Sequence, residues 1–403
     1  MSTGNIYKKN NMLSAVEKNK DFLMIAKTLH GFEDVLINEL KKIGAKKIEK
    51  QNRAVTFEGD MSLLYKANLY LRTALKILKP ITTFSAKNEN ELYKKLQRIK
   101  WDDFIHLNDT FLVDTTISQS KFFNHSKYVS QKTKDAIVDQ FRSKYGRRPS
   151  VNRNTPKIRV NIHINHFNVT VSMDSSGDSL HKRGYRIQRV EAPINEVLAA
   201  GIVLLSNWDK KTILTDPMCG SGTILIESMM IAKNQGPNIN RKNFSFFFWK
   251  DFDQELFQKT KNKLISEEIN NPIKLEGFDY HFQSISASRR NISCMNFSEN
   301  VILKRFNFFD KKKKNEKRHV IFNPPYGQRL EILDSDFYKK MGNILKQFYS
   351  GSKVSIITSD IENIKLLGLK PYKRIKLFNG ALESHLLQYN LYDGSQKTET
   401  ISF

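Results

Sequence analysis

The stretch "TILTDPMCGSGTILIESMMIA", residues 212–232, decides the fold. An apolar run ends at Asp216, a turn containing Gly220 and Gly222 follows, and an amphipathic helical pattern completes the stretch. Glycines let the backbone approach a ligand closely, and the free N–H groups at the start of a helix can hold the polar end of that ligand. The stretch therefore predicts a strand, a ligand-binding turn and a helix.

The second half of the chain repeats this alternation of strands and helices. Helical segments separate strand-like runs at 212–216, 274–279, 301–308, 319–322 and 353–358. Such alternation is typical of a doubly wound parallel sheet, so we expect an α/β, Rossmann-like domain.

The first half mixes helices and strands without strict alternation, which favours an α+β region. Apolar spacing predicts helices over "GFEDVLINELKKIG", "MSLLYKANLYLRTALKIL" (61–78), "NENELYKKLQRI" and "SQKTKDAIVDQFRSKYG". It predicts strands over "FLMIAKT", "RAVTFEG" and "TFLVDTTIS", and a hairpin over "KIRVNIHINHFNVTVSMD".

The glycine turn can be assigned to a class of ligand. A dinucleotide fits poorly, because Leu225 replaces the third glycine of its fingerprint and no acid follows about 20 residues later. A Walker phosphate loop is excluded, because no Gly-Lys-Ser/Thr follows. An acid just before a Gly-Ser-Gly turn suits a ligand with a cationic end and hydroxyl groups, such as S-adenosylmethionine. We predict Asp216 at its amino acid end, Asp279 at the ribose and Asp310 at the adenine amine.

The corner "NPPY" follows the fourth strand of this half, at 323–326. A rigid strand stop would explain two prolines, but a chemical interpretation fits better. The exocyclic amine of a base is nearly planar and poorly nucleophilic, so oxygen acceptors must draw its hydrogens aside. Asn323 and the backbone carbonyl of Pro324 can accept these hydrogens, with Pro325 holding the corner rigid. Tyr326 can stack on a base that has left its helix or loop.

Composition bounds the partners and the compartment. The net charge of +25, from 66 Lys and Arg against 41 Asp and Glu, points to a polyanion and favours nucleic acid. Two cysteines cannot form a disulfide framework and suit a reducing cytosol. The polar N-terminus and the short apolar segments give no sign of a secretory signal or a membrane span. We expect a cytoplasmic protein without a metal site or a membrane partner.

These residues resemble the THUMP-domain class I S-adenosylmethionine-dependent RNA guanine-N2 methyltransferases, including those that act on 23S ribosomal RNA. The motifs that carry the resemblance include "LHKRGYR", "DPMCGSGTILIE", "FSFFFWKDFD", "NPPYGQRL" and "KLFNGALESHLLQYNLY". It implies a ferredoxin-like piece, a THUMP domain and a seven-stranded sheet with a final hairpin that turns at Asn379-Gly380. Relatives with a second methyltransferase also make 7-methylguanosine, but here we expect only the guanine-N2 activity.

The resemblance implies the following division and site residues. We expect tails at 1–20 and 393–403, the ferredoxin-like piece at 21–60, the THUMP domain at 61–173 and the methyltransferase domain at 174–392. The residues expected to hold the cofactor are Ala192, Pro193, Asp216, Pro217, Cys219, Gly220, Gly222, Thr223, Asp279, Asp310 and Asn323. Asn323, Pro324, Pro325 and Tyr326 are expected to hold the target base.

Basic residues that crowd the THUMP-like region and the following junction predict contacts to RNA phosphates. They are Lys127, Lys132, Lys134, Arg142, Lys144, Arg147, Arg148, Arg153, Lys182, Arg183 and Arg186, with Phe122 or Phe123 as further candidates for stacking. The substrate predicted first is 23S rRNA, naked or in a pre-ribosomal particle, and we expect a monomer. A tRNA guanine-N2 methyltransferase, a DNA adenine-N6 methyltransferase and a non-catalytic RNA-binding assembly factor remain as alternatives.

Overall fold

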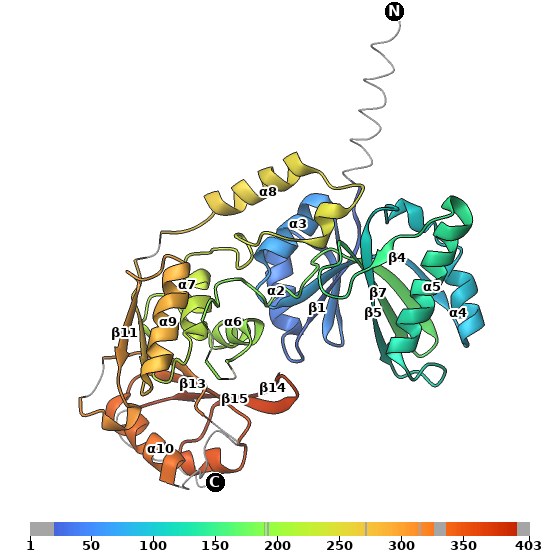
Figure 1. The fold of residues 1–403 in the computed structure, drawn as a ribbon. Helices are drawn as coiled ribbons and strands as arrows, with labels where there is room; N and C mark the ends of the chain where they lie inside the picture. Colours follow the sequence, from blue (N-terminus) through green and yellow to red (C-terminus); the bar gives the residue numbers. More distant parts are fainter. Residues whose placement is uncertain are drawn as a thin grey trace, which may run out of the picture. The chain divides into compact units, whose positions relative to one another are not determined.

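A computed structural model describes residues 20–188, 190–191, 193–270, 272–313, 316–325 and 336–392 (Figure 1). The chain forms two compact units. Among the described residues, unit 1 contains those up to Thr28 together with Leu36–Lys182 and Asn238–Ser266; unit 2 contains Leu29–Val35, Arg183–Pro237 and those from Glu267 onward. The domain boundaries expected at residues 60 and 173 stay predictions. These boundaries divide the chain into consecutive segments. In the structure, however, Asn238–Ser266 belong to unit 1, although they lie within the range expected for the methyltransferase domain.

Unit 1 is built on one eight-stranded sheet, with the order β2-β3-β1-β4-β8-β7-β5-β6. Its strands are β1 (Phe22–Thr28), β2 (Lys46–Gln51), β3 (Ala54–Gly59), β4 (Ala74–Ser85), β5 (Thr110–Ser118), β6 (Ser150–Val151), β7 (Ile158–Asn165) and β8 (Asn168–Asp174). Its helices are α2 (Glu33–Lys42, which belongs to unit 1 from Leu36 onward), α3 (Met61–Tyr70), α4 (Glu89–Leu96), α5 (Ser126–Tyr145) and α8 (Gln254–Ser266), with 3-10 turns η1 (Trp101–Asp103) and η2 (Ser245–Phe248). The expected hairpin is confirmed, because β7 and β8 pair antiparallel.

The helix predicted over 61–78 is wrong in its second half. Helix α3 ends at Tyr70, and the backbone is already extended at Leu71, with φ −66° and ψ 125°. The Glu39 carboxylate on α2 accepts the N–H groups of Arg72 (2.9 Å) and Thr73 (3.0 Å), which takes these groups out of a helical ladder. Strand β4 then begins at Ala74. Local apolar spacing cannot reveal a carboxylate that arrives from another helix.

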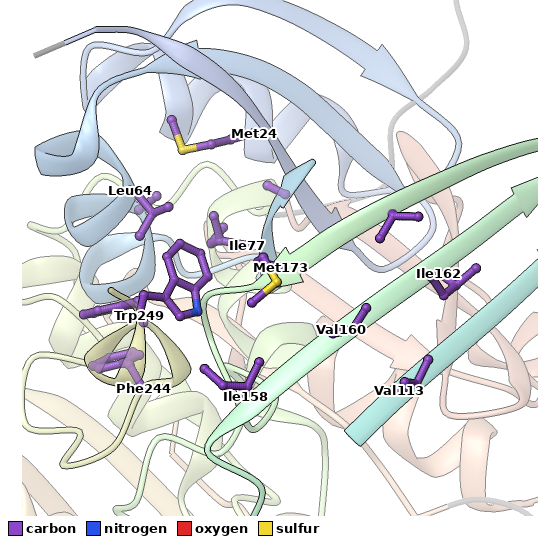
Figure 2. Close-up of a cluster of buried hydrophobic side chains, with 14 of the residues drawn as sticks. Met24, Leu64, Ile77, Val113, Ile158, Val160, Ile162, Met173, Phe244 and Trp249 are labelled. Carbon is purple, nitrogen blue, oxygen red and sulfur yellow. The ribbon is translucent and has the colours of Figure 1, made fainter. Parts of the chain in front are cut away.

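The core of unit 1 joins the sheet to the segment that returns at Asn238–Ser266. Phe244 and Trp249 of this segment are buried in the same cluster as Ile158 and Met173 of the sheet. Figure 2 shows these side chains together with Ile77 and Leu64. Burial of such large aromatic side chains contributes roughly 1.5–3 kcal/mol each, so the returning segment is anchored firmly on unit 1.

Unit 2 is built on a seven-stranded sheet, with the order β11-β10-β9-β12-β13-β15-β14. Its strands are β9 (Leu214–Asp216), β10 (Leu275–Asp279), β11 (Val301–Arg305), β12 (His319–Phe322), β13 (Lys353–Thr358), β14 (Lys373–Asn379) and β15 (Leu382–Asn390). Its helices are α6 (Glu196–Leu205), α7 (Thr223–Ala232), α9 (Phe282–Cys294) and α10 (Asp336–Phe348), with 3-10 turns η3 (Phe308–Asp310) and η5 (Asn363–Leu367).

The topology of unit 2 confirms the predicted class I sheet. The five strands from β9 to β13 run parallel, and β15 pairs antiparallel with β13. Strands β14 and β15 form the expected final hairpin, and Gly380 in its turn has a φ of +67°. On one face Tyr338 and Leu345 of α10 pack with Phe322 and Leu387; on the other, Gln388 donates to the Leu205 carbonyl of α6 (2.9 Å). Ligands of such sheets bind at the edge where the parallel strands end.

Candidate functional site

A cavity of about 500 Å³ lies in unit 2, at the carboxyl ends of β9, β10 and β12. Its walls combine the glycine turn, the acid that closes β10, the η3 turn and the corner after β12. The residues that line it include Pro193, Asp216, Pro217, Cys219, Gly220, Thr223, Asp279, Asn307, Asn323, Pro324 and Pro325. The volume is within the range of roughly 300–1,000 Å³ that is usual for small-molecule and cofactor sites.

The glycine turn is tied to the neighbouring strand by its backbone. Gly220 and Gly222 have φ values of +53° and +79°, a backbone conformation that residues with a Cβ rarely adopt. The Cys219 N–H donates to the Phe278 carbonyl (2.8 Å), and the Gly220 N–H donates to the Asp279 carboxylate (2.9 Å). The turn therefore needs its glycines for conformation and Asp279 for position.

The two acids at this edge have different surroundings. Asp216 is 1% exposed, and burial with the nearby Asp279 raises the pKa of its carboxyl well above the usual range. Its Oδ1 accepts the Met218 N–H (3.1 Å), which favours the charged form and partly opposes that shift. Asp279 accepts N–H groups on both oxygens, from Gly220 and from His281 (2.9 Å). A ligand with a cationic group next to Asp216 would therefore relieve an unfavourable buried charge.

Helix α9 supports the turn from behind. Ser288 Oγ donates to the Gly220 carbonyl (2.7 Å), and Asn291 Nδ2 donates to the Ser221 carbonyl (3.1 Å). Ser288 and Asn291 lie three residues apart, so they share one face of the helix. Neither residue was predicted from the sequence; the available signal was a pair of polar residues at this spacing on a helix that follows a ligand-binding acid.

Asp310, the acceptor predicted after the third strand, lies outside the cavity lining that the structure describes. Strand β11 ends at Arg305, short of the predicted 308, and the Phe306 N–H bonds back to the Asp279 carbonyl (3.0 Å). The chain then turns through η3, so Asp310 is exposed and is not among the described residues that line the cavity. Asn307 lines the cavity instead, and its Oδ1 also accepts the Phe309 N–H (3.1 Å).

The corner after β12 brings an unsatisfied acceptor to the same cavity. Asn323 Oδ1 is buried and has no hydrogen-bond partner among the described residues, and Pro324 and Pro325 line the wall beside it. A buried, unpaired polar atom costs about 1–3 kcal/mol. Several described side chains have such an atom, and among them Asn323 is the one that lines the cavity. Tyr326 and Ala192 lie outside the described residues.

The remaining wall is held by Arg186. Its Nη2 donates to the Ile194 carbonyl (2.9 Å) and to Thr223 Oγ1 (3.2 Å), and it pairs with Glu196 (3.1 Å). The side chain thus joins the segment around Pro193 to the first residue of α7.

Comparison with known proteins identifies the chain. Residues 183–388, half of the sequence, match the methyltransferase domain of the RMKL-like family. The chain belongs to this family. Residues 86–174 match the THUMP domain, and residues 23–78 match the RlmL ferredoxin-like domain. The predicted family, its fold and its character as a methyltransferase are confirmed.

Individual proteins that resemble this chain are also described as methyltransferases. The chain is 34% identical over 370 residues to a putative RNA methyltransferase of Synechocystis, covering 91% of this chain and 96% of that protein. It is 33% identical over 375 residues to the ribosomal RNA large subunit methyltransferase K/L of Syntrophotalea carbinolica, covering 90% of this chain but 52% of that protein. The chain thus spans about half the length of this relative. A solved structure, described as a putative methyltransferase complexed with SAH, is 31% identical, with a TM-score of 0.82 over 93% of this chain and 100% of its own.

Within the family's methyltransferase domain, two of the predicted RNA contacts are internal. The Arg183 side chain is 1% exposed and forms an ion pair with the buried Glu227 (3.5 Å), which also accepts the Tyr185 hydroxyl (2.9 Å). Arg186 is engaged with the cavity wall as described. The structure therefore gives both arginines positions inside the domain, whereas Lys182 is exposed.

The basic residues of the THUMP match and its neighbourhood are more accessible. Arg142, Lys144, Arg147, Arg148 and Arg153 are exposed, as is Lys127, while Lys132 and Lys134 are half-buried. Some carry partners already: Lys144 pairs with Asp102, Arg142 with Asp139 and Lys134 with Asp135. Phe123 is buried and Phe122 is exposed. A contact of any of these side chains with RNA stays a prediction.

The described residues contain neither a helix suited to cross a membrane nor a cluster suited to hold a metal ion. No helix there combines the length and the apolar composition that a membrane crossing requires. No group of three or more His, Cys, Asp or Glu side chains there could hold a metal ion.

Proposed function

We propose that this protein transfers a methyl group from S-adenosylmethionine to the exocyclic N2 of guanine in RNA, with 23S rRNA as the first candidate substrate. The observation that carries the proposal is the buried, unpaired Oδ1 of Asn323 at the cavity that also contains Asp216 and Asp279. An acceptor and a cofactor pocket at one edge are what methylation of an amine requires.

The residues of the cavity fit the cofactor. Asp216 would hold the cationic amino acid end, because that charge would offset the cost of its own burial. Asp279, whose oxygens are already oriented by two N–H donors, would accept the ribose hydroxyls. We propose Asn307 rather than Asp310 for the adenine amine, because Asn307 lines the cavity. When bound, the sulfonium of this cofactor supplies an electrophilic methyl group.

The corner would prepare the nucleophile. Asn323 Oδ1 and the Pro324 carbonyl would accept the two hydrogens of a guanine amine and turn its lone pair out of conjugation with the ring. The two prolines fix the backbone, so the acceptors do not have to be ordered when the base arrives. Pre-oriented polar groups in a site that excludes water act more strongly than they would in solution.

RNA as the substrate class is supported by three observations of different kinds. The chain contains a match to the THUMP domain, carries a net charge of +25, and resembles relatives that are named as RNA methyltransferases. Counterion release by such a basic protein favours a polyanionic substrate. Because the chain spans half of the rRNA methyltransferase K/L relative, the choice of 23S rRNA rests on the name of that longer protein and is part of the proposal.

The test is nucleoside mass spectrometry of rRNA and tRNA from cells with and without the gene. Loss of N2-methylguanosine from large-subunit rRNA alone is the expected result. Loss from tRNA alone would identify tRNA as the substrate instead of 23S rRNA. Unchanged N2-methylguanosine in both RNA classes would refute the proposed reaction.

A further inference from the structure

Unit 1 contains a second hollow whose walls come from three separate segments. It measures about 370 Å³ and lies between residues 154–159, residues 177–182 and residues 241–248. The last of these segments falls within the sequence range matched by the methyltransferase domain, although its residues belong to unit 1. We call this hollow the 157–242 groove, after two of the lysines that line it.

The groove is a built feature, because the returning segment is fastened to both other walls. Arg241 donates to the carbonyls of Ser176 (3.1 Å), Asp178 (2.6 Å) and Ser179 (3.2 Å). Ser245 Oγ donates to the Lys157 carbonyl (2.8 Å). Gly177 has a φ of +74°, and a Cβ there would lie 3.2 Å from the Ser245 amide nitrogen. Conformation and close approach therefore both favour glycine at this position.

The charge of the groove is mainly positive. Its lining contains Lys157, Arg159, Lys182, Arg241 and Lys242, against one carboxylate, Asp178. Two further carboxylates reach in, Asp109 to Lys157 (3.5 Å) and Asp114 to Arg159 (3.5 Å), which leaves an excess of cations. Lys242 is exposed, and no ion pair joins it to a carboxylate in the part of the chain that the structure describes. An anionic partner would therefore find an unneutralised ammonium group at this rim.

An aromatic side chain stands beside these cations. In the run Phe244, Phe246, Phe247 and Phe248 the first two are buried and the third is partly buried, but Phe248 is 40% exposed. The Lys157 ammonium lies 5.7 Å from the centre of its ring. A single exposed phenylalanine is ordinary. An exposed ring on the wall of a cationic groove is the combination that binds unpaired bases, through stacking and phosphate contacts together.

We propose that the 157–242 groove binds an unpaired nucleotide of the RNA substrate, with Phe248 stacking on its base and Lys242 contacting a neighbouring phosphate. The size of the groove suits one nucleotide rather than a duplex. The proposal rests on the proposed function, since it assumes an RNA substrate. The proposed site includes residues of the segment 241–248, which lies outside the sequence range of the THUMP match.

The test compares two lysine-phenylalanine pairs of the full-length protein. Phe167 is also 40% exposed, with the Lys87 ammonium 6.0 Å from its ring centre, but neither residue lines the groove. The probe is a fluorescein-labelled RNA hairpin with a single-stranded 3′ tail, and binding is measured by anisotropy. Phe248→Ala should weaken binding about tenfold, as expected for loss of one stacked base. Lys242→Gln should reduce the slope of log K against log salt by about 0.7, as for one single-strand phosphate contact.

The controls Phe167→Ala and Lys87→Gln should leave both quantities unchanged, and all four variants should keep the wild-type affinity for S-adenosylhomocysteine. Phe248→Tyr should restore binding. If RNA affinity fell equally for the groove pair and the control pair, or fell for neither, the proposed role of the groove would be overturned. Binding of a ribosomal protein that depends on Phe248 while RNA affinity does not would also overturn it. A wild-type chain that binds the cofactor but neither binds nor methylates RNA would refute the proposed function as well. This outcome distinguishes failure of the proposed function from failure of the groove alone.

Discussion

Replacing Asn323 by alanine tests the proposed chemistry with an unusual signature, because activity should fall steeply while stability stays nearly unchanged. Asn323 Oδ1 is buried without a partner in the described chain, so the substitution breaks no hydrogen bond of that atom. A buried unpaired polar atom costs about 1–3 kcal/mol, and its removal should offset the contacts that the truncation loses. We therefore expect the free energy of unfolding to stay within about 1 kcal/mol of wild type.

The rate of methyl transfer should fall steeply in the same variant. Loss of one pre-oriented hydrogen-bonding group at a reacting centre typically lowers kcat by about 10²–10³-fold, equivalent to about 3–4 kcal/mol of transition-state stabilisation. Asn323 would act on the substrate amine, whereas Asp216 and Asp279 would hold the cofactor, so the cofactor's dissociation constant should change little. Single-turnover transfer of a labelled methyl group to RNA measures the rate, calorimetry measures the cofactor's affinity, and denaturant titration measures stability.

Asn300→Ala is the matched control. Asn300 precedes β11, at the opposite edge of the same sheet, and its Nδ2 donates weakly to the Ile273 carbonyl (3.4 Å). This variant should lose at most about 1 kcal/mol of stability and keep its turnover. If Asn323→Ala retained wild-type turnover, or lost activity only in proportion to cofactor affinity, the acceptor role would be refuted.

Three further outcomes are expected. Asn307→Ala should weaken binding of S-adenosylhomocysteine in calorimetry, whereas Asp310→Ala should not, because of these two residues only Asn307 lines the cavity; the reverse result would support Asp310, the acceptor predicted from the sequence. Gly342→Ala should cost about 3 kcal/mol or more in denaturant unfolding, since its Cβ would lie 2.0 Å from the backbone carbonyl oxygen of Leu367. Burial lowers the pKa of His319 to about 4 from 6.5, so only the unfolded chain binds this proton between those values. Stability should thus fall by up to about 3 kcal/mol as the pH drops through that window, and a His319→Gln variant whose unfolding free energy varied with pH as much as that of wild type would contradict this origin.

The sequence predicted the parts of the site that depend on local backbone chemistry. The glycine turn, the acid that closes β10 and the Asn-Pro-Pro corner each follow a strand directly, and parallel strands bring their carboxyl ends to one edge. Their meeting at one cavity therefore required only the order of the strands. The sequence did not indicate that Asn307 lines the cavity, because β11 ends where the Phe306 N–H bonds back to β10, which no local pattern encodes.

The same limit applies outside the cavity. The end of α3 depends on the Glu39 carboxylate, and the burial of Arg183 depends on Glu227 of α7. In both cases a charged side chain that looks solvated in the sequence has a specific partner far along the chain. Net charge and spacing indicate how many basic residues could meet RNA, but the ion pairs within the fold decide which of them remain available.

The cofactor side and the Asn323 side of the cavity differ in how many of their polar atoms are hydrogen-bonded within the protein. Both oxygens of Asp279 already accept backbone N–H groups, and Ser288 and Asn291 hold the carbonyls of the glycine turn. The cofactor half is thus organised by bonds that exist before any ligand arrives, and its glycine conformations are compensated locally. Asn323 Oδ1 has no hydrogen-bond partner in the described chain, so this acceptor is available to a donor that a ligand brings. A base amine that supplies two hydrogens is such a donor, which is why the unpaired oxygen, more than the glycine turn, argues for methylation of an amine.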